Sequence, residues 1–441
     1  MSMPKFLLPV VLASALTLLA LPVTAAGGAG LGGGISGSSD PDMPGEVLVK
    51  LKTTDALTPL LAKYPLTLVS RFGARPIYRL KVIGAARVKD VLAALALEPD
   101  VMLAETNPTQ RAPEARKNVA WTIGTAQAYA TQWAPHTLRL AEAQRLSTGA
   151  GVRVAVLDTG VDPTHPLLAG RLLPGFDFVD FDTDPSEVGS PHNGAYGHGT
   201  HVAGLVAMVA PDARIMPLRV LDPDGMGNAW VLAEALLYAV DPDGNPATDD
   251  GAHVISMSLG SLARTRLIDT IAQIVGCTAP LPNDPAGDLS DAGYDDDKAR
   301  CAAGHGAVVI AAAGNEASSN VKEYPAAEGV YGLLALAASN SSARLASFSN
   351  TGSWIGLAAP GESITSSVPG GGYGTWSGTS MAAPLAAGTA ALVRSLDPAM
   401  TPGDVVRRLR RASAMLCGTQ LRQVDAAAAV TNVVPPAITC P

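Results

Sequence analysis

The residues Ser377-Gly378-Thr379-Ser380-Met381-Ala382-Ala383-Pro384 decide how the rest of the chain is interpreted. Small residues lead into Ser380, and an apolar run with helical spacing follows it as far as Val393. We expect Pro384 to fall in the first turn of this helix, where backbone N–H groups have no intrahelical partner, so that the proline need not break it. Ser380 is then either an ordinary N-cap or a hydroxyl placed where the helix dipole favours an oxyanion.

Three further stretches carry side chains that suit a nucleophilic serine. Asp158-Thr159-Gly160-Val161-Asp162 follows an apolar run, His198-Gly199-Thr200-His201 opens a helix-like segment, and Asn315 follows Ala311-Ala312-Ala313-Gly314. Taken singly, each has a structural explanation: a turn residue, a histidine at a helix start and a loop amide. Only the combination of these stretches with Ser380 indicates a catalytic site.

The combination predicts the roles of four side chains. A serine hydroxyl is a weak nucleophile and needs a base, which His198 would provide. Asp158 would hold the imidazole in one tautomer and stabilise its positive form. The Asn315 side chain and the Ser380 backbone N–H would donate hydrogen bonds to the oxygen of a tetrahedral intermediate.

The order of the apolar runs predicts an α/β fold, a doubly wound and mostly parallel sheet with helices on both faces. Short runs bounded by glycine or aspartate predict strands at 152–157, 215–221, 254–259 and 307–313. Helix-like segments at 198–209 and 229–240 lie between them. In such sheets the working site lies at the carboxyl ends of the strands, where Asp158 and Asn315 fall.

With the four stretches in hand, the sequence resembles the subtilisin-like serine proteases, or subtilases. Asp158, His198 and Ser380 occur in that family's chain order, which differs from the orders in chymotrypsin and the α/β-hydrolases. The resemblance covers roughly residues 130–430. It implies a serine-type endopeptidase that hydrolyses peptide bonds through an acyl-enzyme on Ser380.

The resemblance also implies where a peptide substrate lies. The substrate would run in extended form between residues 225–227 and residues 258–260, held by main-chain hydrogen bonds. Residues 312–314 would wall the pocket for the residue before the cut. Small walls imply broad specificity with a large apolar residue there, although Glu316 at the rim could favour a basic one. The residues concerned are Gly225, Met226, Gly227, Ser258, Leu259, Gly260, Ala312, Ala313 and Gly314.

The first residues predict export. Lys5 precedes an apolar run from Phe6 to Leu21, and Val23-Thr24-Ala25 offers a signal-peptidase cut, so residues 1–26 are predicted to be a signal peptide. The alternative is an uncleaved membrane anchor, but the apolar core is short and prolines interrupt it. We expect a secreted protein, extracellular or periplasmic, without a membrane attachment after signal removal.

Residues 27–43 are predicted to be a flexible glycine-rich linker, and residues 44–110 a small α+β, ferredoxin-like domain. Period-two alternation predicts strands around 47–51 and 77–81, and a helical period predicts a helix over 86–97. A short strand is expected at 101–104.

This small domain resembles, more weakly, the inhibitory propeptide of the subtilases, which assists folding and is then cut away; a permanent accessory domain is the alternative. Nine Lys and Arg against six Asp and Glu make it basic, whereas the rest of the chain from 111 onward is acidic, and opposite charges favour docking. Residues 111–133 are predicted to be an exposed connector containing the maturation cut, which would fall between 108 and 133. Residues 134–441 would form the peptidase domain.

Charge and cysteine content exclude several classes. A net charge of −8 argues against a nucleic-acid surface. The four cysteines form no C-x-x-C pair, which disfavours a zinc ribbon, and in a secreted chain they suggest disulfides, most simply Cys277–Cys301 and Cys417–Cys440. Four cysteines allow three pairings, so this choice rests on proximity alone. The expected partners are protein or peptide substrates and the chain's own propeptide, and a monomer is expected.

No cofactor is required for the expected chemistry, but a structural calcium ion is an open alternative because members of the family often bind it. Oxygen-rich loops are the right ligand type. However, Leu167 stands where many relatives carry a ligating Asp, and solvated acidic loops remain the competing interpretation. The two candidate ligand sets are Asp177, Asp180, Asp182 and Asp184, or Asp241, Asp243, Asn245 and Asp249.

Two other functions stay open at this point. A non-enzymatic peptide-binding protein could retain the groove, although a dead relative usually lacks one of the four site residues, and all four are present here. An enzyme that keeps the nucleophile could also prefer ester hydrolysis or peptide ligation.

Overall fold

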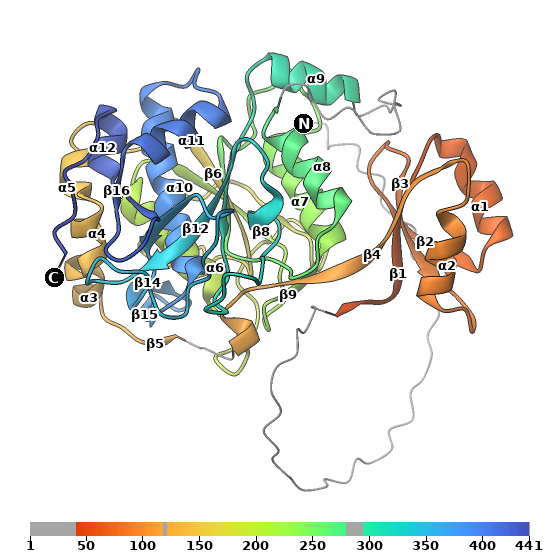
Figure 1. Cartoon of the computed structure of the whole chain (residues 1–441), viewed down its shortest axis with the longest axis horizontal. Helices are drawn as coiled ribbons and strands as arrows, with labels where there is room; N and C mark the ends of the chain where they lie inside the picture. Colours follow the sequence, from red (N-terminus) through yellow and green to blue (C-terminus); the bar gives the residue numbers. More distant parts are fainter. Residues whose placement is uncertain (1–40, 118–120, 279–293, 441) are drawn as a thin grey trace, which may run out of the picture. The chain divides into compact units, whose positions relative to one another are not determined.

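The structure is a computed structural model that describes residues 41–117, 121–278 and 294–440 (Figure 1). The predicted signal peptide lies outside the described residues, as does the predicted linker except for its last residues.

The N-terminal part forms the small α+β domain that the sequence predicts. Its strands lie in the sheet order β2-β3-β1-β4, all antiparallel, and two helices complete the βαββαβ order of a ferredoxin-like fold. The elements are β1 (Asp42–Leu51), η1 (Thr54–Ala56), α1 (Leu57–Lys63), β2 (Leu66–Arg71), β3 (Ile77–Val82), α2 (Val88–Leu95) and β4 (Val101–Arg111). Alternating side chains of β1, among them Val47 and Val49, pack on Leu80 and Leu95 in a separate small core.

A nine-stranded sheet with the order β16-β17-β13-β12-β11-β10-β6-β8-β7 forms the larger part. All its pairings are parallel except β16 with β17. The strands are β6 (Arg153–Asp158), β7 (Phe176–Asp177), β8 (Arg214–Arg219), β10 (Val254–Met257), β11 (Val308–Ala312), β12 (Leu333–Ser339), β13 (Leu357–Pro360), β16 (Ser413–Met415) and β17 (Arg422–Val424).

Helices cover both faces of this sheet, which confirms the predicted fold class (Figure 1). Val154 and Val156 of β6 pack in one core with α6 (His198–Val209) and α10 (Thr379–Leu396), and Ala155 and Leu157 pack in the other with α7 (Ala229–Val240) and α8 (Arg266–Val275). The remaining elements are η2 (Ala115–Lys117), β5 (Thr122–Ile123), α3 (Ala126–Thr131), α4 (Trp133–Thr137), α5 (Leu140–Ala143), β9 (Met226–Asn228), α9 (Tyr294–Ala302), η3 (Ala326–Glu328), β14 (Ile364–Val368), β15 (Gly372–Trp376), α11 (Pro402–Arg411) and α12 (Ala426–Thr431).

One expectation about α10 is wrong. Pro384 lies in the second turn of the helix and not in the first. Its missing N–H would ordinarily bond to the carbonyl of Ser380, four residues earlier. The Ser258 hydroxyl donates to that carbonyl instead, at 2.8 Å, so the buried oxygen keeps a partner and the helix continues.

The expected exposed connector at 111–133 is also partly wrong. Ala112 and Glu114 are buried against the larger part of the molecule, and three short elements, η2, β5 and α3, form in this segment. The residues of this segment are buried by contacts with parts of the chain that are distant in sequence. A local hydrophobic period does not reveal such contacts.

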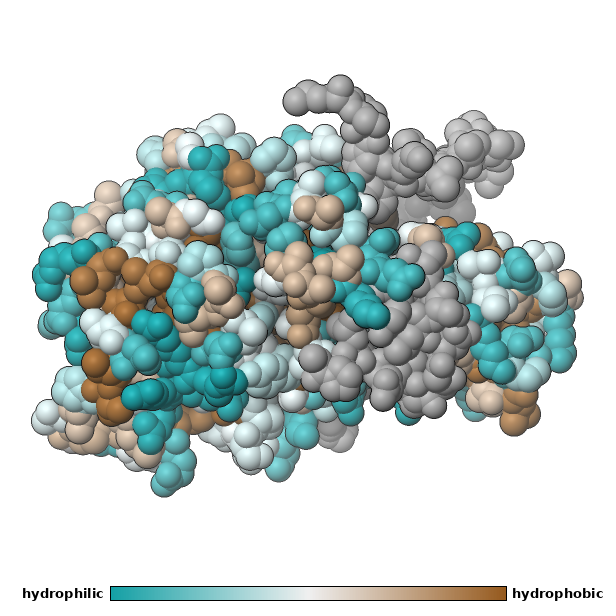
Figure 2. All heavy atoms as spheres, turned by 90° about the horizontal axis from the view of Figure 1, so that it is seen from above, coloured by the Kyte–Doolittle hydropathy of each residue, from teal (hydrophilic) through white to brown (hydrophobic). Residues whose placement is uncertain are grey.

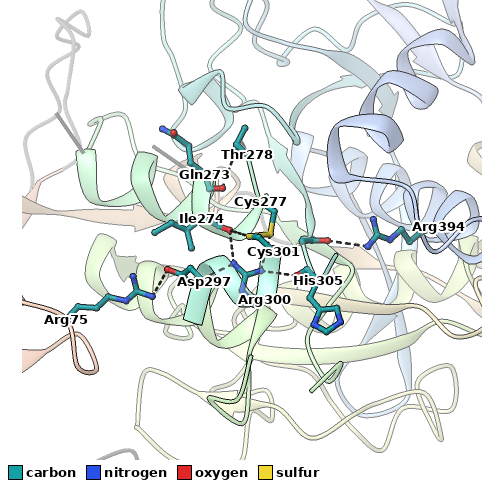
Figure 3. Close-up of a disulfide and its surroundings, with 11 residues drawn as sticks. Arg75, Gln273, Ile274, Cys277, Thr278, Asp297, Arg300, Cys301, His305 and Arg394 are labelled. Atoms are coloured by element: carbon teal, nitrogen blue, oxygen red, sulfur yellow. Dashed lines mark hydrogen bonds and ion pairs between the residues drawn. A yellow bond between two sulfur atoms is a disulfide. The ribbon is translucent and has the colours of Figure 1, made fainter. Parts of the chain in front are cut away.

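Both expected disulfides are present, Cys277–Cys301 and Cys417–Cys440. The first joins Cys277, which follows α8, to Cys301 within α9 (Figure 3). Arg300 of this helix donates to the carbonyl oxygens of Ile274 and His305, at 2.7 and 2.8 Å, and so ties α9 to the end of α8.

Among the described residues, none of the helices combines the length and apolar character needed to cross a membrane. On the face shown in Figure 2, hydrophobic residues lie in separate groups among hydrophilic ones. Single exposed apolar side chains such as Phe181 and Leu396 are ordinary on a protein surface.

Candidate active site

Asp158 and His198 meet at the carboxyl edge of the parallel sheet. Asp158 is the last residue of β6 and His198 the first of α6, and the imidazole Nδ1 lies 2.7 Å from Asp158 Oδ1. The same carboxylate oxygen accepts the backbone N–H of Thr159 at 2.8 Å. Because Nδ1 donates to a fixed carboxylate, the imidazole presents Nε2 to the site.

Ser380 and Asn315 approach from two other elements. Ser380 is the second residue of α10, and Asn315 follows β11. The Asn315 side-chain oxygen accepts both the N–H and the hydroxyl of Thr379, each at 2.9 Å. These two bonds leave the amide group of Asn315 pointing into the site, which is the orientation that a donor to an oxyanion requires.

A fifth side chain, the carboxylate of Glu114, contacts three of the other four, His198, Ser380 and Asn315. Its Oε2 accepts the Ser380 hydroxyl at 2.6 Å and lies 3.2 Å from His198 Nε2, while its Oε1 accepts the Asn315 amide at 2.8 Å. Gly378 makes room for it, since a Cβ there would stand 1.6 Å from Glu114 Oε1. The carboxylate therefore occupies the space between the expected base, nucleophile and oxyanion donor.

Charges at this centre shift two pKa values. Burial lowers the pKa of His198, but Asp158 and Glu114 outweigh it and raise this pKa to about 10. Burial raises the pKa of Glu114, yet hydrogen bonds from His198, Ser380 and Asn315 hold it below its usual value. An imidazolium paired with a carboxylate has no lone pair for a proton, so His198 cannot act as a base while Glu114 is in place.

Glu187 links the turn after Asp158 to the start of α6 by hydrogen bonds. Its carboxylate accepts the hydroxyls of Thr159 and Thr200, at 2.7 and 2.8 Å, and the backbone N–H of Gly197. Burial raises its pKa to about 7, with the nearby charge of Asp158 adding to the effect. Sequence reasoning missed Glu187, because its only local signal is one acidic residue in a loop.

The expected peptide groove is filled by the chain's own residues 109–112. Residues 109–111 pair antiparallel with β9, and Arg111 exchanges both main-chain hydrogen bonds with Gly260, at 2.8 and 2.9 Å. The Ala112 N–H donates to Gly225 at 3.0 Å. This segment thus makes the strand between residues 225–227 and 258–260 that a substrate was expected to make.

Beyond the groove, the chain turns and η2 follows. The Ala115 N–H closes the turn on the Ala112 carbonyl at 3.0 Å, which brings the side chain of Glu114 and not a backbone carbonyl to Asn315. Arg116 of η2 then reaches the residues beside Ala312, Ala313 and Gly314, and Lys117 donates to the Asn315 carbonyl.

Two side chains of the small domain also bind the larger part. Arg75 pairs with Asp297 of α9 at 2.7 Å, with both side chains largely buried (Figure 3). Glu105 accepts the backbone N–H groups of Arg266 and Leu267, at 3.0 Å each, at the N-terminus of α8, where the helix dipole favours a carboxylate.

The two candidate calcium sets differ in their surroundings. Arg219 binds Asp177 and Asp180, at 2.5 Å each, and its positive charge disfavours a cation at that place. In the second set, Asp249 binds Arg153, while Asp241 and Asp243 gather with Asp250. Neither set as expected from the sequence comes together whole, and calcium binding stays a prediction.

Two family models match the chain. The model described as the Subtilase family matches residues 149–432, and the one described as the fervidolysin N-terminal prodomain matches residues 39–107. Among known proteins, the thermophilic serine proteinase of Bacillus sp. (strain AK1) is 35% identical over 328 residues, which is 72% of this chain and 69% of that protein. Thermitase of Thermoactinomyces vulgaris is 35% identical over 274 residues, which is 60% of this chain and 82% of that protein.

Solved structures share the architecture. Fervidolysin from Fervidobacterium pennivorans matches with a TM-score of 0.68 at 22% identity, a likeness of fold, over 91% of this chain. The match spans 63% of the fervidolysin chain, so this chain covers less than two thirds of its length. A protease of Pseudoalteromonas arctica matches with a TM-score of 0.56 at 30% identity, over 70% of this chain and 99% of that one.

Proposed function

The chain belongs to the subtilase family of serine peptidases, and from this premise we propose that it is a secreted endopeptidase, made as a zymogen that processes itself. Asp158, His198, Ser380 and Asn315 carry the reaction. Residues of the N-terminal part hold the enzyme inactive until they are cut away. The substrates are proteins or peptides, and no cofactor takes part in the chemistry.

The reaction begins once the segment 109–117 has left the cleft. Ser380 Oγ attacks the scissile carbonyl carbon while His198 Nε2 accepts the hydroxyl proton. Asn315 and the Ser380 N–H donate to the oxyanion of the tetrahedral intermediate. Collapse breaks the C–N bond, and His198 returns the proton to the leaving amine. A water molecule, activated by the same imidazole, then hydrolyses the ester on Ser380.

Recognition of the peptide main chain supports broad specificity. The hydrogen bonds that Arg111 and Ala112 make with Gly260 and Gly225 involve only backbone atoms, so they suit many sequences. Small residues at 312–314 leave room for a large side chain before the cut.

The observation that carries the proposal is the position of the Glu114 carboxylate. Its two oxygens contact the nucleophile, the base and the side-chain oxyanion donor together. A carboxylate held by those three groups matches the carboxylate of a cleaved product, so the centre is arranged to bind the reacting group of a peptide. A mere helix cap at Ser380 would account for none of these contacts.

The test is the substitution Ser380→Ala in the full-length secreted chain. We expect it to abolish both self-maturation and casein hydrolysis, because loss of the nucleophile costs several orders of magnitude in rate. Ser377→Ala is the matched control: it removes a nearby hydroxyl that accepts the Ser363 N–H at 2.8 Å, and it should leave both activities unchanged. Unchanged casein hydrolysis by Ser380→Ala would refute the proposal.

A further inference from the structure

A buried carboxylate lies beside the pocket for the residue before the cut. Glu323 is fully buried, and it stands directly behind Gly260, where a Cβ would come within 2.5 Å of its side chain. A Cβ on Gly314 would lie 3.0 Å from Glu323 Oε2. Gly260 pairs with the strand in the groove, and Gly314 precedes Asn315. Glu323 therefore lies between the two walls of this pocket.

The backbone fixes Glu323 in this place. Tyr324, the next residue, exchanges two main-chain hydrogen bonds with Ser261, each at 2.8 Å. Because Ser261 follows Gly260 directly, this pairing holds the backbone of Glu323 beside the groove.

An arginine side chain fills the pocket in the structure. Arg116 forms a bidentate salt bridge with Glu323, with Nη1 at 2.7 Å from Oε2 and Nη2 at 2.8 Å from Oε1. Nη2 also donates to the Gly260 carbonyl at 2.8 Å. Glu316 adds a second carboxylate at the rim, 3.6 Å from Nη1. The guanidinium is thus recognised in the geometry that carboxylates and arginine prefer.

Removal of the connector changes the electrostatics of the pocket. When Arg116 leaves the pocket, the carboxylates of Glu323 and Glu316 remain at its base and rim. An apolar substrate side chain in this pocket would remove water from the Glu323 carboxylate and offer it no hydrogen-bond donor, which is costly. A positively charged substrate side chain restores the pair.

We infer that the pocket before the scissile bond selects a basic side chain, arginine before lysine, and that Glu323 is the residue that selects it. The inference rests on the proposed peptidase function and replaces the apolar preference that the small walls suggest. Arginine is favoured over lysine because its planar fork matches both oxygens of Glu323 and the Gly260 carbonyl at once, whereas an ammonium offers a single point charge.

The test uses the matured enzyme and a peptide series that differs only in the residue before the scissile amide. We expect kcat/KM to be about 100-fold or more higher for arginine than for phenylalanine, with lysine between them. Glu323→Gln should reduce the arginine-to-phenylalanine ratio at least about 30-fold, because it removes the charge and keeps the shape. Glu328→Gln is the matched control: it removes another buried carboxylate paired with an arginine, Arg264, and should leave the ratio as it is.

The outcomes separate the two hypotheses. Cleavage of phenylalanine and leucine peptides ahead of the arginine peptide, or an unchanged ratio in Glu323→Gln, overturns the inference and leaves the peptidase function standing. Cleavage of no peptide overturns the function itself. If the variant does not mature, inhibition of the unsubstituted enzyme decides: benzamidine should compete with substrate far more strongly than neutral benzamide, and equal inhibition overturns the inference.

Discussion

At the scale of single residues, Glu114 and His198 form a charge pair that sets the state of the candidate active site. Burial works against both charges, and each charge stabilises the other. Ser380 and Asn315 also donate hydrogen bonds to Glu114, and His198 donates one to the Asp158 carboxylate. The pair therefore stabilises the docked connector only while Glu114 is ionised and His198 is protonated.

The pair predicts a pH dependence for docking of the segment 109–117. The pKa of Glu114 is lowered in the docked state, so its contribution is present at higher pH and is lost as pH falls through that lowered pKa. The pKa of His198 is raised, so its contribution is present at lower pH and is lost as pH rises through about 10. Hydrogen exchange of the segment in Ser380→Ala, which cannot cut itself, should show protection at intermediate pH that decreases at both extremes.

Glu114→Gln in the same background supplies the comparison. Gln keeps the size of the side chain but has no carboxylate to titrate, so the segment should be less protected near neutral pH and insensitive to acid over the range where Glu114 titrates. The control Glu142→Gln changes an exposed carboxylate outside the segment and should leave the protection of the segment as it is. Equal protection at all pH values in the chain that retains Glu114 would contradict this account.

At the scale of elements, α10 contains an internal proline without losing a buried hydrogen bond. The Ser258 hydroxyl replaces the N–H that Pro384 lacks, and so joins the segment after β10, which lines the groove, to the helix that carries Ser380. This bond couples the position of the nucleophile to the position of the peptide-binding strand.

Ser258→Ala should lower the free energy of unfolding by about 1–3 kcal/mol, because it leaves the buried Ser380 carbonyl without its donor. Denaturant unfolding in the Ser380→Ala background avoids self-digestion. Ser256→Ala, two residues earlier in β10, is the matched control. Its hydroxyl is buried and has no hydrogen-bond partner among the described residues, so its removal should be nearly neutral. If the two variants lose the same stability, the proposed role of Ser258 is wrong.

Elements with a strong period were predictable from sequence. The bounds of α6 and α7 agree with their predicted ranges, because apolar residues and clear ends mark both helices. β2 and α1 were missed, since β2 has exposed apolar residues such as Leu68 and Val69 and therefore no clean alternation. The end of β4 was also missed, because residues beyond 104 are strand only through pairing with distant partners.

At the scale of the whole molecule, the N-terminal part contacts the rest through several independent places. The strand 109–112 fills the groove, Arg75 pairs with Asp297, and Glu105 binds the start of α8. Because these contacts lie at separate places, the small N-terminal domain can stay bound while residues 109–112 occupy the cleft as a substrate would.

The contacts lead to a prediction about maturation. Arg111, Arg116 and Lys117 are the only basic residues between 108 and 133, so an enzyme that cuts after basic residues should leave an N-terminus at Ala112, Lys117 or Asn118. N-terminal sequencing of the active secreted enzyme checks this. A start elsewhere in the range would oppose the basic preference, and active enzyme that has lost only its signal peptide would oppose maturation altogether.

The candidate site shows where sequence reasoning ends. Asp158, His198, Asn315 and Ser380 could be singled out because each sits in a short motif at a strand or helix end. Glu114, Glu187 and Glu323 could not be singled out, since each is one acidic residue without a motif. The role of each depends on packing against residues far away in the chain. Buried charges of this kind carry the inhibition and the specificity that we propose.

The most direct measurement of the central claim, an acyl-enzyme on Ser380, is a mass-spectrometric map of cleavage in a peptide library. The purified enzyme is incubated with the library, with and without a serine-directed covalent inhibitor, and the site of modification is located. The account predicts peptide-bond cleavage that the inhibitor abolishes, with the adduct on Ser380. Cleavage that continues after Ser380 is modified, or an adduct on another serine that abolishes activity, would contradict it.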